Sequence, residues 1–387
     1  MSGKIGFELE MIVLDKDYNE SNKADLIIEE AKKLGVSCGT ECSHSMVEVN
    51  SIPGDIGTSA NDLLNQIESV NDIAERLGLK VLPIEMPINH DFRPIIRDSP
   101  RYDAKKKLLG EDRFEISGKV MGFHVHYDLP PDDDKKLDQI NFLKLVDPLA
   151  VSASASSPFS YGGVEYDSWR THSYRYIVHE ELPFQGQLQK FNPTYEKYVE
   201  EHFEKYNSFL EMTKQKDIDF SEYADEYNSI WGPTRINPGY NTSEIRSMGS
   251  TPDLAMLFGL ASIISGGIKK LTSGYESENL FLDVLSEVDD PNEKYNFIQA
   301  LSDDAMKYGL DSATVKNYCN FLINYCDASL DSQEKKFADY STEKINSDER
   351  LSDIISSNLI SPKEKYSRLH DLYVNSIKQS RELLEEK

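Results

Sequence analysis

Cysteine is scarce in this chain, and its four cysteines follow no pattern typical of a disulfide scaffold. Cys38, Cys42, Cys319 and Cys326 are too few and too scattered to stabilise 387 residues through disulfide bonds. The first two lie close to His44, but no second ligand pair follows at the spacing of a zinc site. We therefore expect four reduced thiols and a cytoplasmic protein.

Long apolar stretches are also lacking. No apolar run approaches the roughly 18 residues that a membrane-spanning helix needs. The first residues show no signal-peptide pattern. The sequence therefore predicts a protein without a membrane segment.

Positive charge is in deficit, because 42 lysines and arginines face 67 acidic residues. The formal net charge of −25 argues against nucleic acid or an anionic membrane surface as the main partner. An anionic substrate such as ATP would need metal ions and a few well-placed arginines to bind such a chain.

Several common catalytic motifs are missing as well. The sequence contains no G-x-x-x-x-G-K-[ST] loop and no G-x-G-x-x-G at the start of a helix. It also lacks the G-x-S-x-G and H-E-x-x-H motifs of serine hydrolases and zinc proteases. A nucleotide would therefore be held by metals and arginines on a sheet, not by a glycine loop.

The pattern of apolar residues predicts strands and helices in the first half of the chain and helices in the second. Strands are expected at 6–14, 45–50, 80–84, 118–128 and 241–247. Helices are expected at 23–34, 60–77 (capped by Ser59), 138–155, 251–268, 291–308, 312–327 and 362–386. Residues 158–245 are expected to form irregular, substrate-covering loops, and the polar stretch 329–352 a mobile linker or an exposed helix.

The first strand carries two carboxylates in an otherwise apolar run. Glu8 and Glu10 are two residues apart, so both side chains point to one face, with Cα atoms about 7 Å apart. Two such charges repel by roughly 2 kcal/mol at an effective dielectric constant near 20. A bound cation would relieve the repulsion, but an edge strand with one wet face explains the pattern equally well.

Three more strands place ionisable groups at inward positions, namely Glu48, the pair His124 and His126, and Glu244 beside Arg246. Carboxylates and imidazoles on rigid strands could form a cage for Mg²⁺ or Mn²⁺. Each signal alone has an ordinary structural explanation. The two histidines could be a hydrogen-bonded structural pair, and the last two residues an ion pair.

Six short segments nevertheless occur in a fixed order. They are Gly6-Phe7-Glu8-Leu9-Glu10; Glu41 followed by Val47-Glu48-Val49; Arg101-Tyr102; Gly122-Phe123-His124-Val125-His126; Ser154-Ala155-Ser156-Ser157-Pro158-Phe159 with Gly162, Ser168 and Arg170 behind it; and Thr242-Ser243-Glu244-Ile245-Arg246. This series resembles glutamate–cysteine ligase family 2, the carboxylate–amine ligases of the glutamine synthetase-like superfamily, over about residues 4–265. Leu9, Ser51 and Met121 depart from the residues usual in the family, which leaves the amine substrate open.

The resemblance implies an α+β fold. We expect a glutamine synthetase-like, curved and mainly antiparallel sheet, with helices on its outer face and a helical C-terminal extension. The catalytic domain would span residues 1–270, and residues 271–387 would form a helical region packed on it.

The resemblance also implies an ATP-dependent ligase that phosphorylates the side-chain carboxylate of glutamate and lets an amine attack the acyl phosphate. The expected product is γ-glutamylcysteine, an intermediate of glutathione biosynthesis. Mg²⁺ (or Mn²⁺) would be held by Glu8, Glu10, Glu48, His124, His126 and Glu244. Arg246 and Arg170 are the candidate catalytic residues, and the candidate ATP-binding residues are Arg246, Arg235 and Arg101. For Arg235, a surface ion pair is equally expected.

Other functions remain open from the sequence. The same chemistry could use another amine or carboxylate, the scaffold could bind metal or nucleotide without catalysis, or the residues could form a metallohydrolase. The expected partners are small molecules, namely ATP, glutamate and an amine such as cysteine. The sequence does not decide between a monomer and a homo-oligomer.

Overall fold

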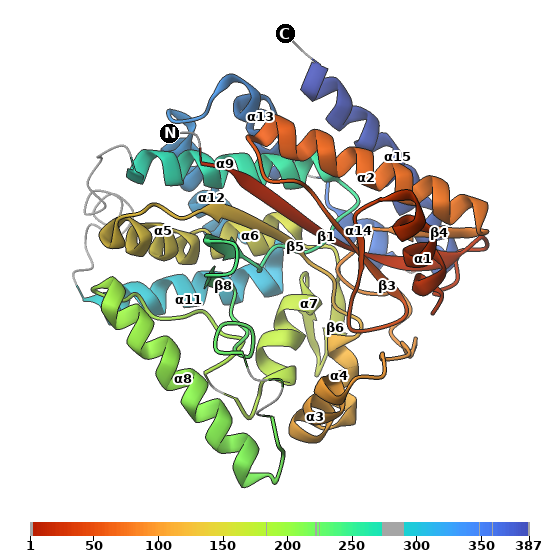
Figure 1. Ribbon diagram of the computed structural model, residues 1–387. Helices are drawn as coiled ribbons and strands as arrows, with labels where there is room; N and C mark the ends of the chain where they lie inside the picture. Colours follow the sequence, from red (N-terminus) through yellow and green to blue (C-terminus); the bar gives the residue numbers. More distant parts are fainter. Residues whose placement is uncertain are drawn as a thin grey trace.

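A computed structural model describes residues 3–182, 184–220, 223, 225–272, 290–347, 349–357 and 359–385 (Figure 1). The strands are β1 (Ile5–Asp15), β2 (Cys38–Thr40), β3 (Met46–Asn50), β4 (Leu79–Leu82), β5 (Phe123–Asp128), β6 (Phe159–Tyr161), β7 (Val164–Tyr166), β8 (Thr234–Asn237) and β9 (Thr242–Ile245). The helices of the first half are α1 (Ala24–Leu34), α2 (Ile56–Arg76), α3 (Pro100–Leu109), α4 (Glu111–Ser117), α5 (Asp133–Leu145), α6 (Asp147–Ser154), α7 (Trp169–His172), the π-helix η1 (Ser173–Val178) and α8 (Tyr195–Gln215). Those of the second half are α9 (Leu254–Thr272), α11 (Pro291–Tyr308), the 3₁₀ helix η2 (Gly309–Asp311), α12 (Ala313–Asp327), α13 (Ser332–Asn346), α14 (Leu351–Ser356) and α15 (Pro362–Glu385).

The central sheet has the strand order β2-β3-β1-β5-β9-β8, and β4 pairs with the C-terminal half of β1. Every pairing between the described strands is antiparallel. Strand β1 therefore lies in the interior of the sheet, and the interpretation of it as an edge strand is wrong. The expected α+β fold with a mainly antiparallel sheet is confirmed.

One face of the sheet is apolar and covered by helices. Leu9, Val125 and Ile245 on β1, β5 and β9 are fully buried on this face. Helices α2, α9 and α15 contact the strands there, and Figure 1 shows them lying along the same side of the sheet. The opposite face is left for the polar side chains of the same strands, because side chains alternate along a strand.

Helix α9 is the apolar centre of this helical layer. Among the described helices, it is the one whose length and composition would suit a membrane span, but 89% of its apolar window is buried inside the protein. The expectation that no apolar stretch approaches such a length was wrong. The helix is apolar because it is surrounded by protein, including α13, which approaches so closely that a Cβ at Gly259 would lie 2.3 Å from the carbonyl oxygen of Phe337.

The stretch 329–352 is largely a packed helix and not a linker. Helix α13 buries Phe337 and Ile345 against the core, and its fully buried Glu334 accepts hydrogen bonds from Ser265 (2.7 Å) and Lys269 (2.6 Å) of α9. Its many charged residues concealed this apolar stripe. The division of the chain near residue 270 stays a prediction, and it falls beside residues 273–289, which lie outside the described part of the chain.

Two further expectations need correction. The segment 158–245 contains the 21-residue helix α8, which packs with α3 around a small separate core of Ala104, Leu108, Leu182, Phe209, Ile218, Phe220 and Ile230. Helix α2 starts earlier than expected, because Asp55 caps it by accepting a hydrogen bond from the Thr58 N–H (2.7 Å). Ser59 instead donates to the carbonyl of Ile5 (2.7 Å) and joins the helix to the sheet.

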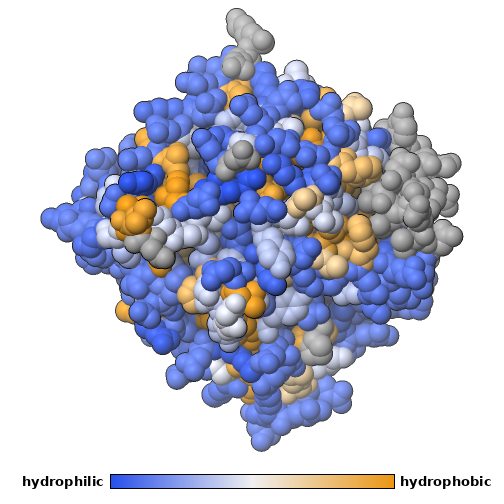
Figure 2. Space-filling view, turned by 180° about the vertical axis from the view of Figure 1, so that it is seen from behind, coloured by the Kyte–Doolittle hydropathy of each residue, from blue (hydrophilic) through white to orange (hydrophobic). Residues whose placement is uncertain are grey.

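The exterior reflects the acidic composition. Figure 2 shows a face dominated by hydrophilic residues, with hydrophobic residues scattered over it. All four cysteines are free, and three of them, Cys42, Cys319 and Cys326, are buried. The expectation of reduced thiols is confirmed.

Candidate active site

The register of the sheet brings the candidate ligands of the sequence together on its polar face. Glu8 lies directly opposite His124, Glu10 opposite Glu48, and His126 opposite Glu244. Residues directly opposite each other in an antiparallel pair have side chains on the same face. Strands β1, β3, β5 and β9 thus position six ionisable groups that are far apart in the sequence.

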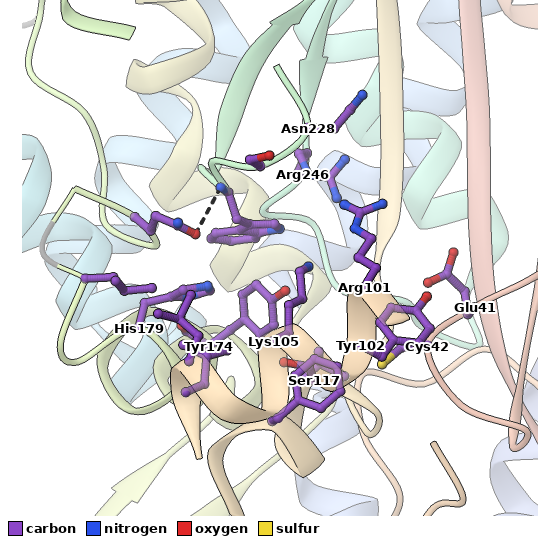
Figure 3. A pocket seen from close by; sticks show the side chains of 18 of the residues that line it. Glu41, Cys42, Arg101, Tyr102, Lys105, Ser117, Tyr174, His179, Asn228 and Arg246 are labelled. Carbon is purple, nitrogen blue, oxygen red and sulfur yellow. Dashed lines mark hydrogen bonds between the residues drawn. The ribbon is translucent and has the colours of Figure 1, made fainter. Parts of the chain in front are cut away.

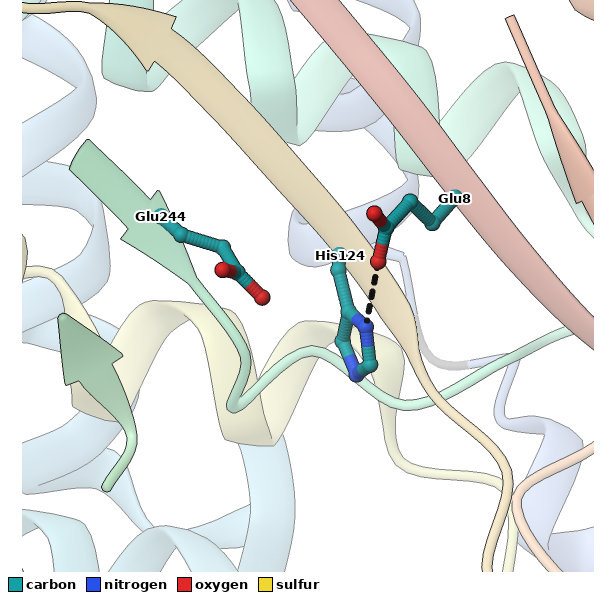
Figure 4. Close-up of side chains that lie close together, drawn as sticks. All are labelled: Glu8, His124 and Glu244. Carbon is teal, nitrogen blue, oxygen red and sulfur yellow. Dashed lines mark hydrogen bonds and ion pairs between the residues drawn. The ribbon is translucent and has the colours of Figure 1, made fainter. Parts of the chain in front are cut away.

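The first of two groups in this region consists of Glu8, His124 and Glu244 (Figure 4). One potential ligand atom from each of the three lies within 4.8 Å of the others. His124 Nδ1 lies 3.1 Å from one oxygen of Glu8, and His126 Nε2 lies 3.2 Å from the other. The three strands β1, β5 and β9 each contribute one member, so the sheet itself fixes the arrangement.

Charges in this first group are balanced by the protein. Glu244 is fully buried and pairs with Arg246 and with Arg235, whose Nε lies 2.6 Å from its carboxylate. Burial alone would raise the pKa of Glu244, but the two arginines lower it to about 2. Burial lowers the pKa of His124 to about 4, with a further contribution from Arg246, so this imidazole is neutral at pH 7.

The second group, Glu10, Glu41 and Glu48, has the opposite electrostatics. One oxygen from each carboxylate lies within 4.8 Å of the others. Burial and the neighbouring Glu48 raise the pKa of Glu10 to about 7, and burial raises the pKa of both Glu41 and Glu48. Arg246 compensates only part of this charge. The cluster holds protons near neutral pH because it lacks enough positive charge.

The residues present fit a divalent metal ion of the kind that the resemblance implies. Three clustered carboxylates form an all-oxygen donor set, which Mg²⁺ and Mn²⁺ prefer. Arg170 and Arg246 offset only part of the charge of the second group, in which the pKa of Glu10 is raised, whereas Arg235 and Arg246 hold the pKa of Glu244 in the first group low. Glu10, Glu41 and Glu48 would hold one ion, and Glu8, His124 and Glu244 form the second candidate set.

Mg²⁺ binding should therefore release protons. At pH 6 the carboxylate of Glu10, with a pKa of about 7, is mostly protonated and must lose its proton to bind the ion. We expect release of about one proton per ion at pH 6 and an affinity that rises as the pH increases from 5 to 7. Titration calorimetry in buffers of different ionisation enthalpy measures both quantities. An affinity that does not change over this range would contradict the assignment.

A cavity of about 330 Å³ adjoins the carboxylates (Figure 3). Glu10, Glu41 and His124 form part of its wall. Five cationic residues line the cavity too, namely Arg101, Lys105, Arg170, Arg235 and Arg246. Figure 3 shows Arg101 and Lys105, both on α3, pointing into the same space as Tyr174.

Four of these five cations keep donors without partners. The Nε atoms of Arg101, Arg170 and Arg246 are buried and form no hydrogen bond with the described residues. Lys105 forms no hydrogen bond or ion pair within the described part of the chain, and burial lowers its pKa to about 8. Buried donors are normally satisfied. The cavity is therefore suited to a ligand with several negatively charged oxygens.

Arg170 is held in place by a buried carboxylate that sequence reasoning missed. Glu85 is fully buried and accepts hydrogen bonds from Ser156 N (2.9 Å), Ser157 Oγ (2.6 Å) and Ser168 Oγ (2.9 Å). Ser157 Oγ accepts in turn from the backbone N–H of Arg170 (3.0 Å). The Ser-rich segment, residues 154–159, therefore binds Glu85 and positions the arginine.

A glycine allows the guanidinium of Arg170 to approach the sheet. A Cβ at Gly122 would lie 2.3 Å from Arg170 Nη2 and 2.9 Å from His124 Nε2. The guanidinium also donates to the carbonyl oxygens of Arg246 (3.3 Å) and Ser247 (3.4 Å). This close approach explains why the residue before the Phe-His-Val-His segment is a glycine and not a residue with a side chain.

The structure brings all the residues proposed from sequence into one region, but only some of them belong to a carboxylate group or have free donors in the cavity. His126 is not a member of either three-residue group, although its Nε2 lies 3.2 Å from Glu8 and 3.9 Å from Glu244, and its Nδ1 lies 2.9 Å from Thr242 Oγ1. Arg235 forms an ion pair with Glu244, but the pair is largely buried inside the site and not at the surface. Glu41 completes the second group, although no ligand role was predicted for it. Lys105 was missed because no helix was expected at α3, where it lies one turn after Arg101.

Comparison with known sequences identifies a family. The family model described as glutamate-cysteine ligase family 2 (GCS2) matches residues 4–328. No curated protein sequence matches the chain significantly.

Solved structures show the same fold at low sequence identity. The glutamate–cysteine ligase of Francisella tularensis, solved in complex with AMP, is 14% identical with a TM-score of 0.64; the alignment covers 100% of this chain and 95% of that one. A bifunctional glutathione synthetase from Pasteurella multocida is also 14% identical, with a TM-score of 0.61. That alignment covers 98% of this chain but 52% of the synthetase, so the chain spans about half of its length.

Proposed function

The chain belongs to glutamate-cysteine ligase family 2, and we propose that it is an ATP-dependent carbon–nitrogen ligase that joins the side-chain carboxyl group of glutamate to the amino group of cysteine. ATP would phosphorylate the carboxylate, and the amine would displace phosphate from the resulting γ-glutamyl phosphate. The product would be γ-glutamylcysteine, which places the protein in glutathione biosynthesis.

The observation that carries this proposal is a single cavity where a carboxylate cluster lacks cations and several cations lack anions. Glu10 and Glu41 belong to the first set, and Arg101, Lys105 and Arg246 to the second. Mg²⁺, or Mn²⁺, would neutralise phosphate charge when bound at the carboxylates. A triphosphate beside a carboxylate substrate would satisfy both sets of groups.

The arginines suit different parts of the reaction. Phosphoryl transfer spreads negative charge over the transferred group, and fixed cations stabilise it. Arg246 lies beside both carboxylate groups and Arg170 is rigidly held, so we assign the transferred phosphoryl group to these two. Arg101 and Lys105 are assigned to the carboxylates of the amino-acid substrate, since their donors are free.

The wall of the cavity can protect the acyl phosphate from water. Tyr174 and Trp231 are in edge-to-face contact with ring centroids 4.5 Å apart, and Trp231 stacks on His179. Gln185 Oε1 accepts a hydrogen bond from the Trp231 backbone N–H (3.3 Å) and holds this loop in place. A closed aromatic wall of this kind excludes water from a reactive intermediate.

The direct test measures release of ADP and phosphate from ATP in the presence of Mg²⁺, glutamate and one of a panel of amines. We expect turnover with cysteine, and we expect it to stop when ATP, glutamate or cysteine is left out. Turnover with another amine would keep the ligase and change its product. No turnover with any amine, or cleavage of a substrate without ATP, would contradict the proposal.

Replacement of Lys105 by alanine should raise the KM for glutamate by roughly tenfold or more, because a charge-assisted hydrogen bond contributes about 1.5–3 kcal/mol. Above pH 8 the wild-type KM should rise as well, since Lys105 loses its proton there. The matched control is Lys107→Ala on the exposed face of the same helix, which should leave KM unchanged. Equal KM values for Lys105→Ala and wild type would contradict the assignment.

A further inference from the structure

A second cavity, of about 690 Å³, lies on the other side of the Ser-rich segment. It is enclosed by residues of α6, α9, α13, α14 and α15, and it shares no lining residue with the first cavity. Much of its wall is apolar, formed by Ala153, Met256, Leu310, Leu351, Ile354 and Leu372. A cavity of this size with apolar walls can hold a small organic molecule.

Asp167 is an acidic group of this wall that forms no ion pair with the described residues. Its carboxylate accepts a hydrogen bond from Ser352, and no lysine or arginine among the described residues lies within 4.0 Å of it. Burial raises its pKa to about 6, and Asp311 and Asp353 act in the same direction, whereas Ser352 and the more distant Arg350 offset only part of this rise. Asp253, by contrast, is already satisfied by the N–H of Met256 (3.0 Å) and the hydroxyl of Tyr340 (3.0 Å).

The two cations in the wall have acidic neighbours of their own. Lys344 Nζ lies 3.7 Å from Glu349, and Arg350 Nε lies 3.8 Å from Asp311, which does not line the cavity. Arg350 also donates to the carbonyl oxygen of Ser347 (2.6 Å). Its Nε forms no hydrogen bond with the described residues. Four carboxylates, those of Asp167, Asp253, Glu349 and Asp353, nevertheless face these two cations in the wall, and this excess of negative charge favours a positively charged ligand.

A separate observation points to a ligand with a polar group. Thr251 lines the same cavity, is 1% exposed, and its Oγ1 forms no hydrogen bond with any described residue. A buried hydroxyl without a partner is costly in a folded protein. An ammonium group is a suitable partner, because it donates up to three hydrogen bonds and carries a positive charge that would balance the carboxylate of Asp167.

We propose that this cavity binds a primary organic ammonium ion with a short apolar body, separately from the active site. The ammonium group would pair with Asp167, Thr251 would provide a further hydrogen-bond acceptor within the cavity, and the apolar body would lie against Leu351, Ile354 and Leu372. The site does not depend on the ligase activity, so its test needs no turnover.

The test is a ligand-observed NMR titration of the full chain with n-hexylammonium, with hexan-1-ol and hexanoate as neutral and anionic analogues. Excess Mg²⁺ is present to occupy the carboxylates of the active site. We expect hexylammonium to bind at least tenfold more tightly than either analogue. Equal affinity for the three, or no binding of hexylammonium, would overturn the proposal.

Two variants locate the site. Asp167→Asn should weaken hexylammonium binding at least tenfold, whereas Asp339→Asn, which removes the same charge from a 58% exposed side chain of α13 outside the cavity, should change it less than threefold. Ala153→Phe keeps every charge and fills the cavity, so it should also abolish binding. Thermal unfolding identifies variants that fail to fold. Tight binding that persists in folded Ala153→Phe would overturn the proposal.

Discussion

Replacement of Glu41 by glutamine should lower the rate of ADP release by a factor on the order of 10²–10³ and at the same time stabilise the metal-free protein. Glu41, Glu10 and Glu48 place carboxylate oxygens within 4.8 Å of one another. Two unit charges at that distance repel by roughly 3 kcal/mol at an effective dielectric constant of 20. Glutamine removes this charge, keeps the shape of a protonated glutamate, and takes away one metal-binding carboxylate.

The stability gain should be about 1 kcal/mol, because protons already relieve part of the repulsion at pH 7. Urea unfolding in the presence of a chelator measures it, and Mg²⁺ should reverse the order of the two proteins. Glu75→Gln, on the exposed face of α2, is the control and should change neither property. A variant that stays active, or that is less stable than wild type without metal, would show that the cluster is not a metal site.

The strands of the sheet could be predicted because polar and apolar residues alternate along them in the sequence, and the apolar ones are those that the structure buries against the helices. Glu8, Glu10, His124 and His126 stand at alternate positions between apolar residues, so their common face follows from the pleat alone. The pairing of one strand with another does not follow from the pleat. The sequence therefore predicted convergence of these residues but could not show that Glu10 and Glu48 are direct neighbours.

The residues that were missed lie where local pattern and tertiary structure disagree. Helix α3 has almost no apolar stripe, since Ala104 and Leu108 are its only buried side chains, so Lys105 had no helical context. Glu85 lies two residues after Pro83 in an apparent loop, and its importance comes from Ser156, Ser157 and Ser168, more than 70 residues away. No local signal marks a contact of that kind.

Replacement of Glu85 by alanine should have the largest effect on folding, lowering the free energy of unfolding by about 3–5 kcal/mol. The variant leaves Ser156 N, Ser157 Oγ and Ser168 Oγ without their shared acceptor in a site with no access to water. Arg170 would also lose the buried carboxylate that offsets its charge. Turnover per folded molecule should fall at least a hundredfold, because the guanidinium is no longer fixed.

A purely structural role and a positioning role differ in measurable ways. Glu85→Gln keeps the volume of the side chain and an acceptor for Ser156 and Ser157, so it should recover most of the stability. Its kcat should stay low, because the negative charge of the carboxylate is missing. Gly122→Ala displaces Arg170 Nη2 from the opposite side without touching Glu85, and it should also lower kcat. Gly57→Ala in α2, whose new Cβ would meet ordinary contacts of 3.5 Å and 3.7 Å outside the site, is its control. If Glu85→Gln and Gly122→Ala both turned over like wild type, the hydrogen bonds of Glu85 would support the fold but not catalysis.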